Sequence, residues 1–319
     1  MVRSRLFSVF AVVLTGPAGR AEPVYSPWPM PAGGGPAAVA AAPLGGLWAT
    51  SDGVTVEVRD VRGAVRLSRG VADLSALVPG MNAASARVAR VCLSDSGRLL
   101  FVLLTRPEAS QPGVGRWEDV IRIDVETGEV SLFVTLAVTP DRAAALPGPI
   151  LHVGGRLSYG SGGAVAQFSA TRNQLTGGTL GSIPTQSGVD VVALAFDRVG
   201  GWLFAVDANG VLFRMSPTAA PSTPLGNVGV GVVSAAFSEH YGGAANAGLY
   251  LGYADGRVRF VSAAAARGSP PVVAGDYASG AGAQSVAAGC DGSLLVGDSL
   301  GARRVLDTAD TRLGFDAWL

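Results

Sequence analysis

The chain of 319 residues is predicted to fold as β-sheet throughout, in repeated units of four antiparallel strands. Three observations predict this. An apolar anchor recurs at residues 47, 100, 157, 203, 249 and 294, at intervals of 53, 57, 46, 46 and 45 residues. A tight turn recurs at a similar distance after most anchors, and no stretch has the pattern of a long amphipathic helix. Units of this length match the blades of a β-propeller, so we predict a six-bladed propeller.

Each unit holds its strands in a fixed order. A unit begins with an apolar strand, such as VVALAF (191–196), VVSAAF (232–237) or SVAAGC (285–290). The anchor strand then turns back into a third strand, as in GWLFAVDANGVLFRM (201–215), where Asp-x-Asn-Gly between apolar runs is typical of a β-hairpin. A fourth apolar stretch, such as VSLFVTLAV (130–138), completes the unit.

The second and third units are less regular. In the second, the insertion RPEASQPGVGRW (106–117) delays the return strand. Pro-, Gly- and Ser-containing segments at 139–149, 216–226 and 262–271 are interpreted as connections between blades, because the repeat resumes after each one.

The two ends of the chain together supply one further unit. From residue 295 to the last residue there are 25 residues, and from 22 to 46 another 25, about one period. Since ring closure removes exposed sheet edges, this favours six blades with both termini in the last one. Seven blades remain an alternative if 22–36 or 104–118 contain further strands.

The first 21 residues resemble a secretory signal peptide. Arg3 and Arg5 precede the short apolar core LFSVFAVVL (6–14), and small residues at 19 and 21 precede Glu22. We therefore expect export to the periplasm or the extracellular space, and a single propeller domain over residues 22–319. No later apolar run has the length of a membrane span.

Charge composition excludes one class of partner. Basic and acidic residues balance at 24 each, whereas nucleic-acid binding normally requires a basic excess, so no nucleic acid is expected. A protein, a small molecule or a carbohydrate is the expected partner.

Two segments, 191–215 and 285–307, resemble NHL repeats, in which a strand, an acidic-Gly turn and a basic-apolar return strand follow one another. The same pattern occurs in six-bladed propellers of the gluconolactonase/regucalcin-like and sorbosone-dehydrogenase-like families. The resemblance concerns the fold. Metal-dependent gluconolactonase-like proteins also use an Asp at the end of such a strand, together with a Glu and an Asn that have no counterparts here.

Four aspartates end the anchor strands and are predicted to lie on one rim of the propeller: Asp52, Asp207, Asp255 and Asp298. Carboxylates around a channel mouth could bind Ca²⁺ or another divalent metal. The competing interpretation is that each Asp stabilises its own turn by accepting backbone hydrogen bonds.

Four further residues are candidates for recognition or crosslinking. Trp28 and Trp117 are predicted in a Pro-rich segment and an inserted loop, where an exposed ring could stack on a sugar or a partner. Cys92 and Cys290 could form one disulfide in an oxidising compartment or remain thiols. The two histidines, His152 and His240, are expected to be structural.

No complete catalytic set is recognisable. The leading prediction is an exported propeller that binds or scaffolds, without catalysis of its own. The alternative is a metal-dependent hydrolase or lactonase that uses the Asp rim, and a third is a subunit of a larger assembly.

Overall fold

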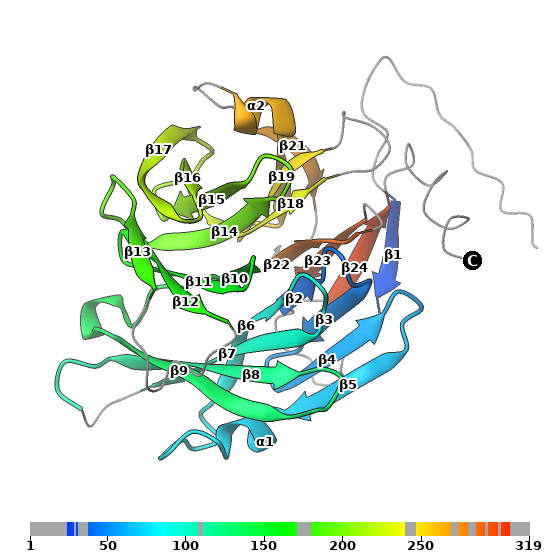
Figure 1. The fold of residues 1–319 in the computed structure, drawn as a ribbon, viewed down its shortest axis with the longest axis vertical. Helices are drawn as coiled ribbons and strands as arrows, with labels where there is room; N and C mark the ends of the chain where they lie inside the picture. Colours follow the sequence, from blue (N-terminus) through cyan, green and yellow to red (C-terminus); the bar gives the residue numbers. More distant parts are fainter. Residues whose placement is uncertain are drawn as a thin grey trace, which may run out of the picture.

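The structure is a computed structural model that describes residues 24–28, 30, 38–107, 111–170, 180–239, 247–268, 274–279, 285–290, 293–298 and 301–306. In this part of the chain it shows six four-stranded antiparallel sheets arranged around a common centre (Figure 1). The predicted all-β propeller fold is therefore confirmed, and the number of blades is six. The signal peptide predicted at 1–21 and His240 lie outside the described residues.

Blades I to III follow the chain from its N-terminal part. From the axis outward, their strands are β2 (Ala38–Ala41), β3 (Leu47–Ser51), β4 (Thr55–Asp60) and β5 (Val65–Gly70) in blade I; β6 (Arg87–Leu93), β7 (Leu99–Pro107), β8 (Arg116–Asp124) and β9 (Val130–Val138) in blade II; and β10 (Ile150–Val153), β11 (Arg156–Ser161), β12 (Ala164–Ser169) and β13 (Gly181–Pro184) in blade III.

Blades IV to VI complete the ring. Their strands are β14 (Val191–Asp197), β15 (Trp202–Asp207), β16 (Val211–Ser216) and β17 (Ala219–Asn227) in blade IV; β18 (Val232–Ser238), β19 (Gly248–Tyr253), β20 (Arg257–Ser262) and β21 (Gly275–Ser279) in blade V; and β22 (Ser285–Ala288), β23 (Leu294–Asp298), β24 (Gly301–Leu306) and β1 (Val24–Trp28) in blade VI.

Two features close the ring. The first strand of each blade contacts the first strands of both neighbouring blades, so β2, β6, β10, β14, β18 and β22 surround the axis (Figure 1). In blade VI, β1 pairs with β24 and places Val24 opposite Leu306, so this blade contains strands from both ends of the described chain.

The core is divided among the interfaces between blades. Buried apolar side chains form one cluster between each pair of neighbouring blades in the described part of the chain. Strand β15 shows why the anchor strands are continuously apolar: Leu203 faces the cluster shared with blade III, and Phe204 the cluster shared with blade V. Successive side chains point to opposite faces, and here both faces are buried. Each such aliphatic or aromatic residue stabilises the fold by about 1.5–3 kcal/mol.

Helices are short in this fold. They are α1 (Val71–Ser75) after blade I, α2 (Ala263–Arg267) inside blade V, and the 3₁₀ helix η1 (Pro140–Arg142) between blades II and III. Among the described residues, no helix has the length and apolar character needed to cross a membrane.

Two of the predicted connections are wrong. Segment 216–226 largely forms β17, the outer strand of blade IV, and segment 262–271 contains α2 within blade V. Both contain Pro or Ser residues that suggest loops, yet a peripheral strand tolerates Pro because its outer side needs no ladder hydrogen bonds. Segment 139–149 does connect two blades.

Candidate functional site

The six first strands enclose a channel along the propeller axis. Its volume is about 150 Å³; most of the residues that line it are aliphatic or aromatic, and about half of the surface they expose to it is polar. Five lining side chains remain only half-buried although they belong to the innermost strands, which places them along the open channel: Leu151, Phe196, Ala235, Phe237 and Ala288. A concave space that combines apolar side chains with placed polar groups is the usual form of a small-molecule site.

Polar side chains gather where the first strands end. Asp95 follows β6, His152 lies in β10, Arg198 follows β14 and Glu239 follows β18. His152, Arg198 and Glu239 line the channel. We call these four residues the collar.

Asp95 joins three of the four collar residues, from blades II, III and IV. Its Oδ1 accepts a hydrogen bond from Arg198 Nη2 at 2.5 Å and lies 3.5 Å from His152 Nδ1. Burial works to raise the pKa of Asp95, but the contacts with His152 and Arg198 outweigh it and hold this pKa well below its usual value. Asp95 is therefore a carboxylate at neutral pH, and it neutralises Arg198.

His152 lies at the channel with its ring largely buried. Its ring stacks on Phe101, with centroids 5.8 Å apart and planes 16° apart. Because Nδ1 faces the Asp95 carboxylate, a neutral His152 ring carries its proton on Nδ1, and Nε2 is then the acceptor. In the described part of the chain Nε2 has no hydrogen-bond partner, and the ring lines the channel.

Glu239 joins blades IV and V. Its Oε1 accepts a hydrogen bond from the Val199 backbone N–H at 2.8 Å. Burial and the neighbouring carboxylate of Asp197 raise its pKa, against the hydrogen bonds from the Val199 and Arg198 backbone. Asp197 is itself held by Arg267 of α2, at 2.6 Å from Nε and 2.7 Å from Nη2.

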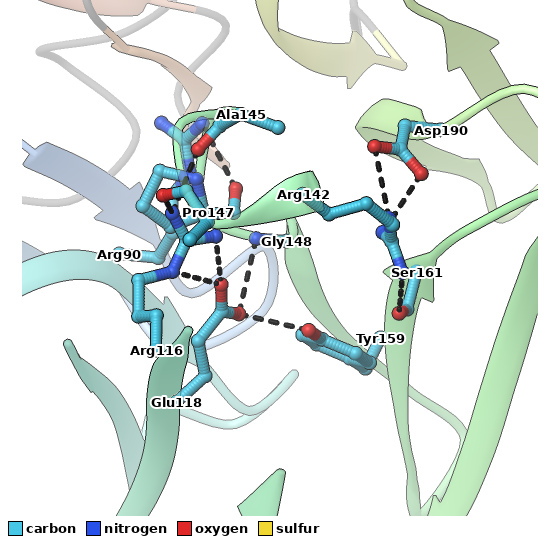
Figure 2. A network of polar contacts seen from close by, with 11 residues as sticks. Arg90, Arg116, Glu118, Arg142, Ala145, Pro147, Gly148, Tyr159, Ser161 and Asp190 are labelled. Carbon is cyan, nitrogen blue, oxygen red and sulfur yellow. Dashed lines mark hydrogen bonds and ion pairs between the residues drawn. The ribbon is translucent and has the colours of Figure 1, made fainter. Parts of the chain in front are cut away.

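A second polar network lies at the other end of the propeller, where the first strands begin (Figure 2). Its centre is Glu118, which is fully buried and accepts hydrogen bonds from Tyr159 Oη at 2.8 Å, Gly148 N–H at 3.1 Å and Arg116 Nη2 at 2.5 Å. Burial, then the charge of Glu118, raises the pKa of Tyr159 above its usual value. The Tyr159 hydroxyl therefore stays protonated and donates to Glu118.

Around this centre, the network ties blades II, III and IV together. Arg142 pairs with Asp190 at 2.7 Å and contacts Ser161, and Arg90 reaches the Pro147 carbonyl at 3.4 Å (Figure 2). These contacts fix the connection between β9 and β10 in place.

Asp52 and Asp207 act in their own turns. Asp52 Oδ1 accepts from the backbone N–H of Val54 and Thr55 at 2.9 and 2.7 Å, and Asp207 Oδ1 accepts from that of Val211 at 2.8 Å. Both side chains are buried, and the Oδ2 atom of each has no partner among the described residues.

Asp298 and Asp255 pair with arginines of their own hairpins. Asp298 is buried against Arg303, and Asp255, with its side chain 52% exposed, lies 2.7 Å from Arg257 Nη2. All four aspartates end or follow second strands. In the described residues no three His, Cys, Asp or Glu side chains come close enough to hold a metal ion.

The two candidate tryptophans lie in strands. Trp28 is buried in β1, and its ring centroid lies 5.8 Å from that of Trp48, so it offers no exposed ring. Trp117 lies in β8 opposite Ala137, half-buried, with the Arg106 guanidinium 5.3 Å from its ring centre. The loop predicted to hold Trp117 is shorter than expected because β7 and β8 extend into the insertion.

Both cysteines line the channel, in blades II and VI. No disulfide joins Cys92 to Cys290 in the structure described. The Cys92 Sγ atom accepts a hydrogen bond from the His152 backbone N–H at 3.0 Å.

The fold is similar to that of known propellers. A chain in the crystal structure of a mitotic checkpoint complex matches with a TM-score of 0.56 and 16% identity, over 94% of this chain and 99% of that one. Streptogramin B lyase matches with a TM-score of 0.52 and 12% identity, over 86% and 93%. These likenesses confirm the predicted resemblance at the level of the fold. No protein-family model matches the sequence, and a search of curated proteins finds no significant match.

Proposed function

We propose that this protein is an exported propeller that binds a ligand or partner at the collar end of its channel, without catalysis of its own. The observation that carries this proposal is the channel itself, whose apolar side chains end in the collar residues His152, Arg198 and Glu239. An apolar wall supplies affinity, and a few fixed polar groups supply orientation.

The collar is ready for binding without rearrangement. The contacts of Asp95 and Glu239 span blades II to V, so a ligand meets side chains already held by their neighbours. Such preorganisation lowers the entropy that binding costs. A propeller fold is compatible with a binding or scaffold role, although fold alone does not decide function.

A thermal-shift screen of small molecules and peptides tests this proposal. A ligand at 100-fold excess over its Kd should raise the free energy of unfolding by about 2.7 kcal/mol. Ala235→Leu, which fills the channel, should abolish the shift. Ala72→Leu, on the exposed side of α1, should not. If hits stabilise the Ala235→Leu protein as well as the wild type, the binding site is elsewhere.

The hydrolase alternative has one observation in its favour, the unpartnered Oδ2 atoms of buried Asp52 and Asp207. Elemental analysis together with a lactone and ester hydrolysis screen separates the two functions. Metal-dependent turnover that falls in Asp207→Ala and Asp298→Ala proteins of unchanged folding would replace the binding proposal.

Export is the remaining part of the proposal, and it is supported by the pattern of residues 1–21. N-terminal sequencing of the protein recovered from outside the cytoplasm should begin at Glu22. Recovery only from the cytoplasm with Met1 retained would contradict export.

A further inference from the structure

We propose that the channel binds a small neutral molecule with an apolar body of about one ring and a single hydroxyl group, which donates a hydrogen bond to His152 Nε2. Phenol is the simplest member of this class. The inference rests on the proposed function, because it names the ligand class of the same channel.

The volume of the channel indicates the size of the ligand's apolar body. The channel volume is about 150 Å³. An apolar cavity of about 150 Å³ holds a benzene-sized guest, whereas larger drug-like ligands need pockets of at least about 300 Å³. One ring or a short aliphatic chain therefore fills this volume.

The wall selects an apolar body. Leu151, Phe196, Ala235 and Phe237 line the channel and also pack against the clusters between blades, so part of their apolar surface is available to a ligand. Burying that surface contributes about 25 cal/mol per Å². A charged body would lose its hydration without recovering it there.

The collar selects a neutral head group. Both arginines near the mouth are already paired, Arg198 with Asp95 at 2.5 Å and Arg267 with Asp197 at 2.6 Å. A ligand carboxylate would therefore meet Asp95 and Glu239 close to Arg198, whose charge Asp95 already neutralises. His152 Nε2, in contrast, is an acceptor that has no partner among the described residues, and a hydroxyl donor satisfies it.

A matched ligand series tests the head group. The purified protein is titrated with phenol, toluene and benzoate, and binding is measured by calorimetry. One net hydrogen bond corresponds to a Kd about 2- to 10-fold lower for phenol than for toluene. Benzoate should bind more weakly than both.

His152 can be observed directly, because the chain contains only two histidines. Phenol should shift the ¹⁵N resonance of His152 Nε2 in an imidazole correlation spectrum, and toluene should leave it in place. His152→Phe keeps a ring beside Phe101 and should make the Kd of phenol equal to that of toluene. The spectrum of the wild type decides the question if this variant does not fold.

Equal affinity of the wild type for phenol and toluene, tighter binding of benzoate, or no binding of any of the three would overturn this inference. The proposed function is judged separately. The proposed function stands if another ligand from the thermal-shift screen stabilises the wild type but not the Ala235→Leu protein. It fails if no ligand distinguishes the two proteins in this way.

Discussion

Cys92 combines a place on the channel wall with a buried thiol. Burial raises its pKa to about 12, the charge of Asp95 acts in the same direction, and the hydrogen bond from His152 N–H only partly offsets them. Since the thiolate is the reactive form, Cys92 is inert at neutral pH. Cys290, which is half-buried at the channel end, is more accessible to solvent than Cys92.

We predict that iodoacetamide at pH 8 modifies Cys290 faster than Cys92, which reacts only after the protein unfolds. Peptide mass spectrometry of samples quenched at intervals measures both rates. Rapid labelling of Cys92 in the folded protein, or a Cys92–Cys290 disulfide in the exported protein, would contradict this prediction.

The ion pairs that arginines form in this chain differ in burial, and burial should decide how much each pair contributes to the free energy of unfolding. Arg116 pairs with fully buried Glu118, whereas the side chain of Arg66 is 59% exposed beside Asp60. Removing one partner of a buried pair leaves an unpaired charge in the interior, while an exposed pair is screened by water.

We therefore expect Arg116→Leu to lower the free energy of unfolding by about 3–5 kcal/mol and Arg66→Leu by about 1 kcal/mol at most. Urea unfolding followed by circular dichroism measures both. Similar losses in the two variants would show that the network in Figure 2 does not hold blades II and III together.

At the scale of elements, the hairpin β15–β16 shows how a turn is encoded. Asp207 accepts backbone hydrogen bonds from Asn209 at 3.0 Å and Val211 at 2.8 Å. Gly210 has φ = 78°, and a Cβ there would lie 2.3 Å from the Gly229 carbonyl oxygen. Only glycine fits that position, so the Asp-x-Asn-Gly pattern is the direct signature of this turn.

Asp207, which is buried, and Asp255, which is exposed, lie in corresponding turns of two blades and provide a matched pair. Asp207→Ala leaves buried backbone donors unsatisfied and should cost about 1–3 kcal/mol. Asp255→Ala, at an exposed turn, should change stability much less. Thermal unfolding of both proteins makes the comparison, and an equal effect would argue that Asp207 is not a turn residue.

The second and third strands of most blades were predictable from the sequence, because their signals are local. Anchor strands such as 203–206 are apolar on both faces, and their turns use Asp and Gly. The outer strand β17 was not predictable, because Pro and Ser in an exposed strand have the composition of a loop. The strand position of Trp117 was not predictable for a similar reason, since Pro and Gly precede β8.

At the scale of the molecule, the ring brings together residues that no local pattern relates. Asp95 and Arg198 are 103 residues apart in sequence and meet because both follow first strands. Polar residues follow the apolar runs of the first strands, as the aspartates follow those of the second strands, so their positions could be predicted from the sequence. Which polar residue each one contacts could not be predicted, because closure of the ring determines it.

The central claim is that the axial channel is a ligand site. A crystal structure of the protein soaked with 4-bromophenol tests it most directly, because the anomalous signal of bromine locates the ligand. We predict one bromine site within the channel beside Phe196 and Phe237, with the hydroxyl group within hydrogen-bond distance of His152 Nε2. An empty channel with bromine only on the outer surface would contradict the account.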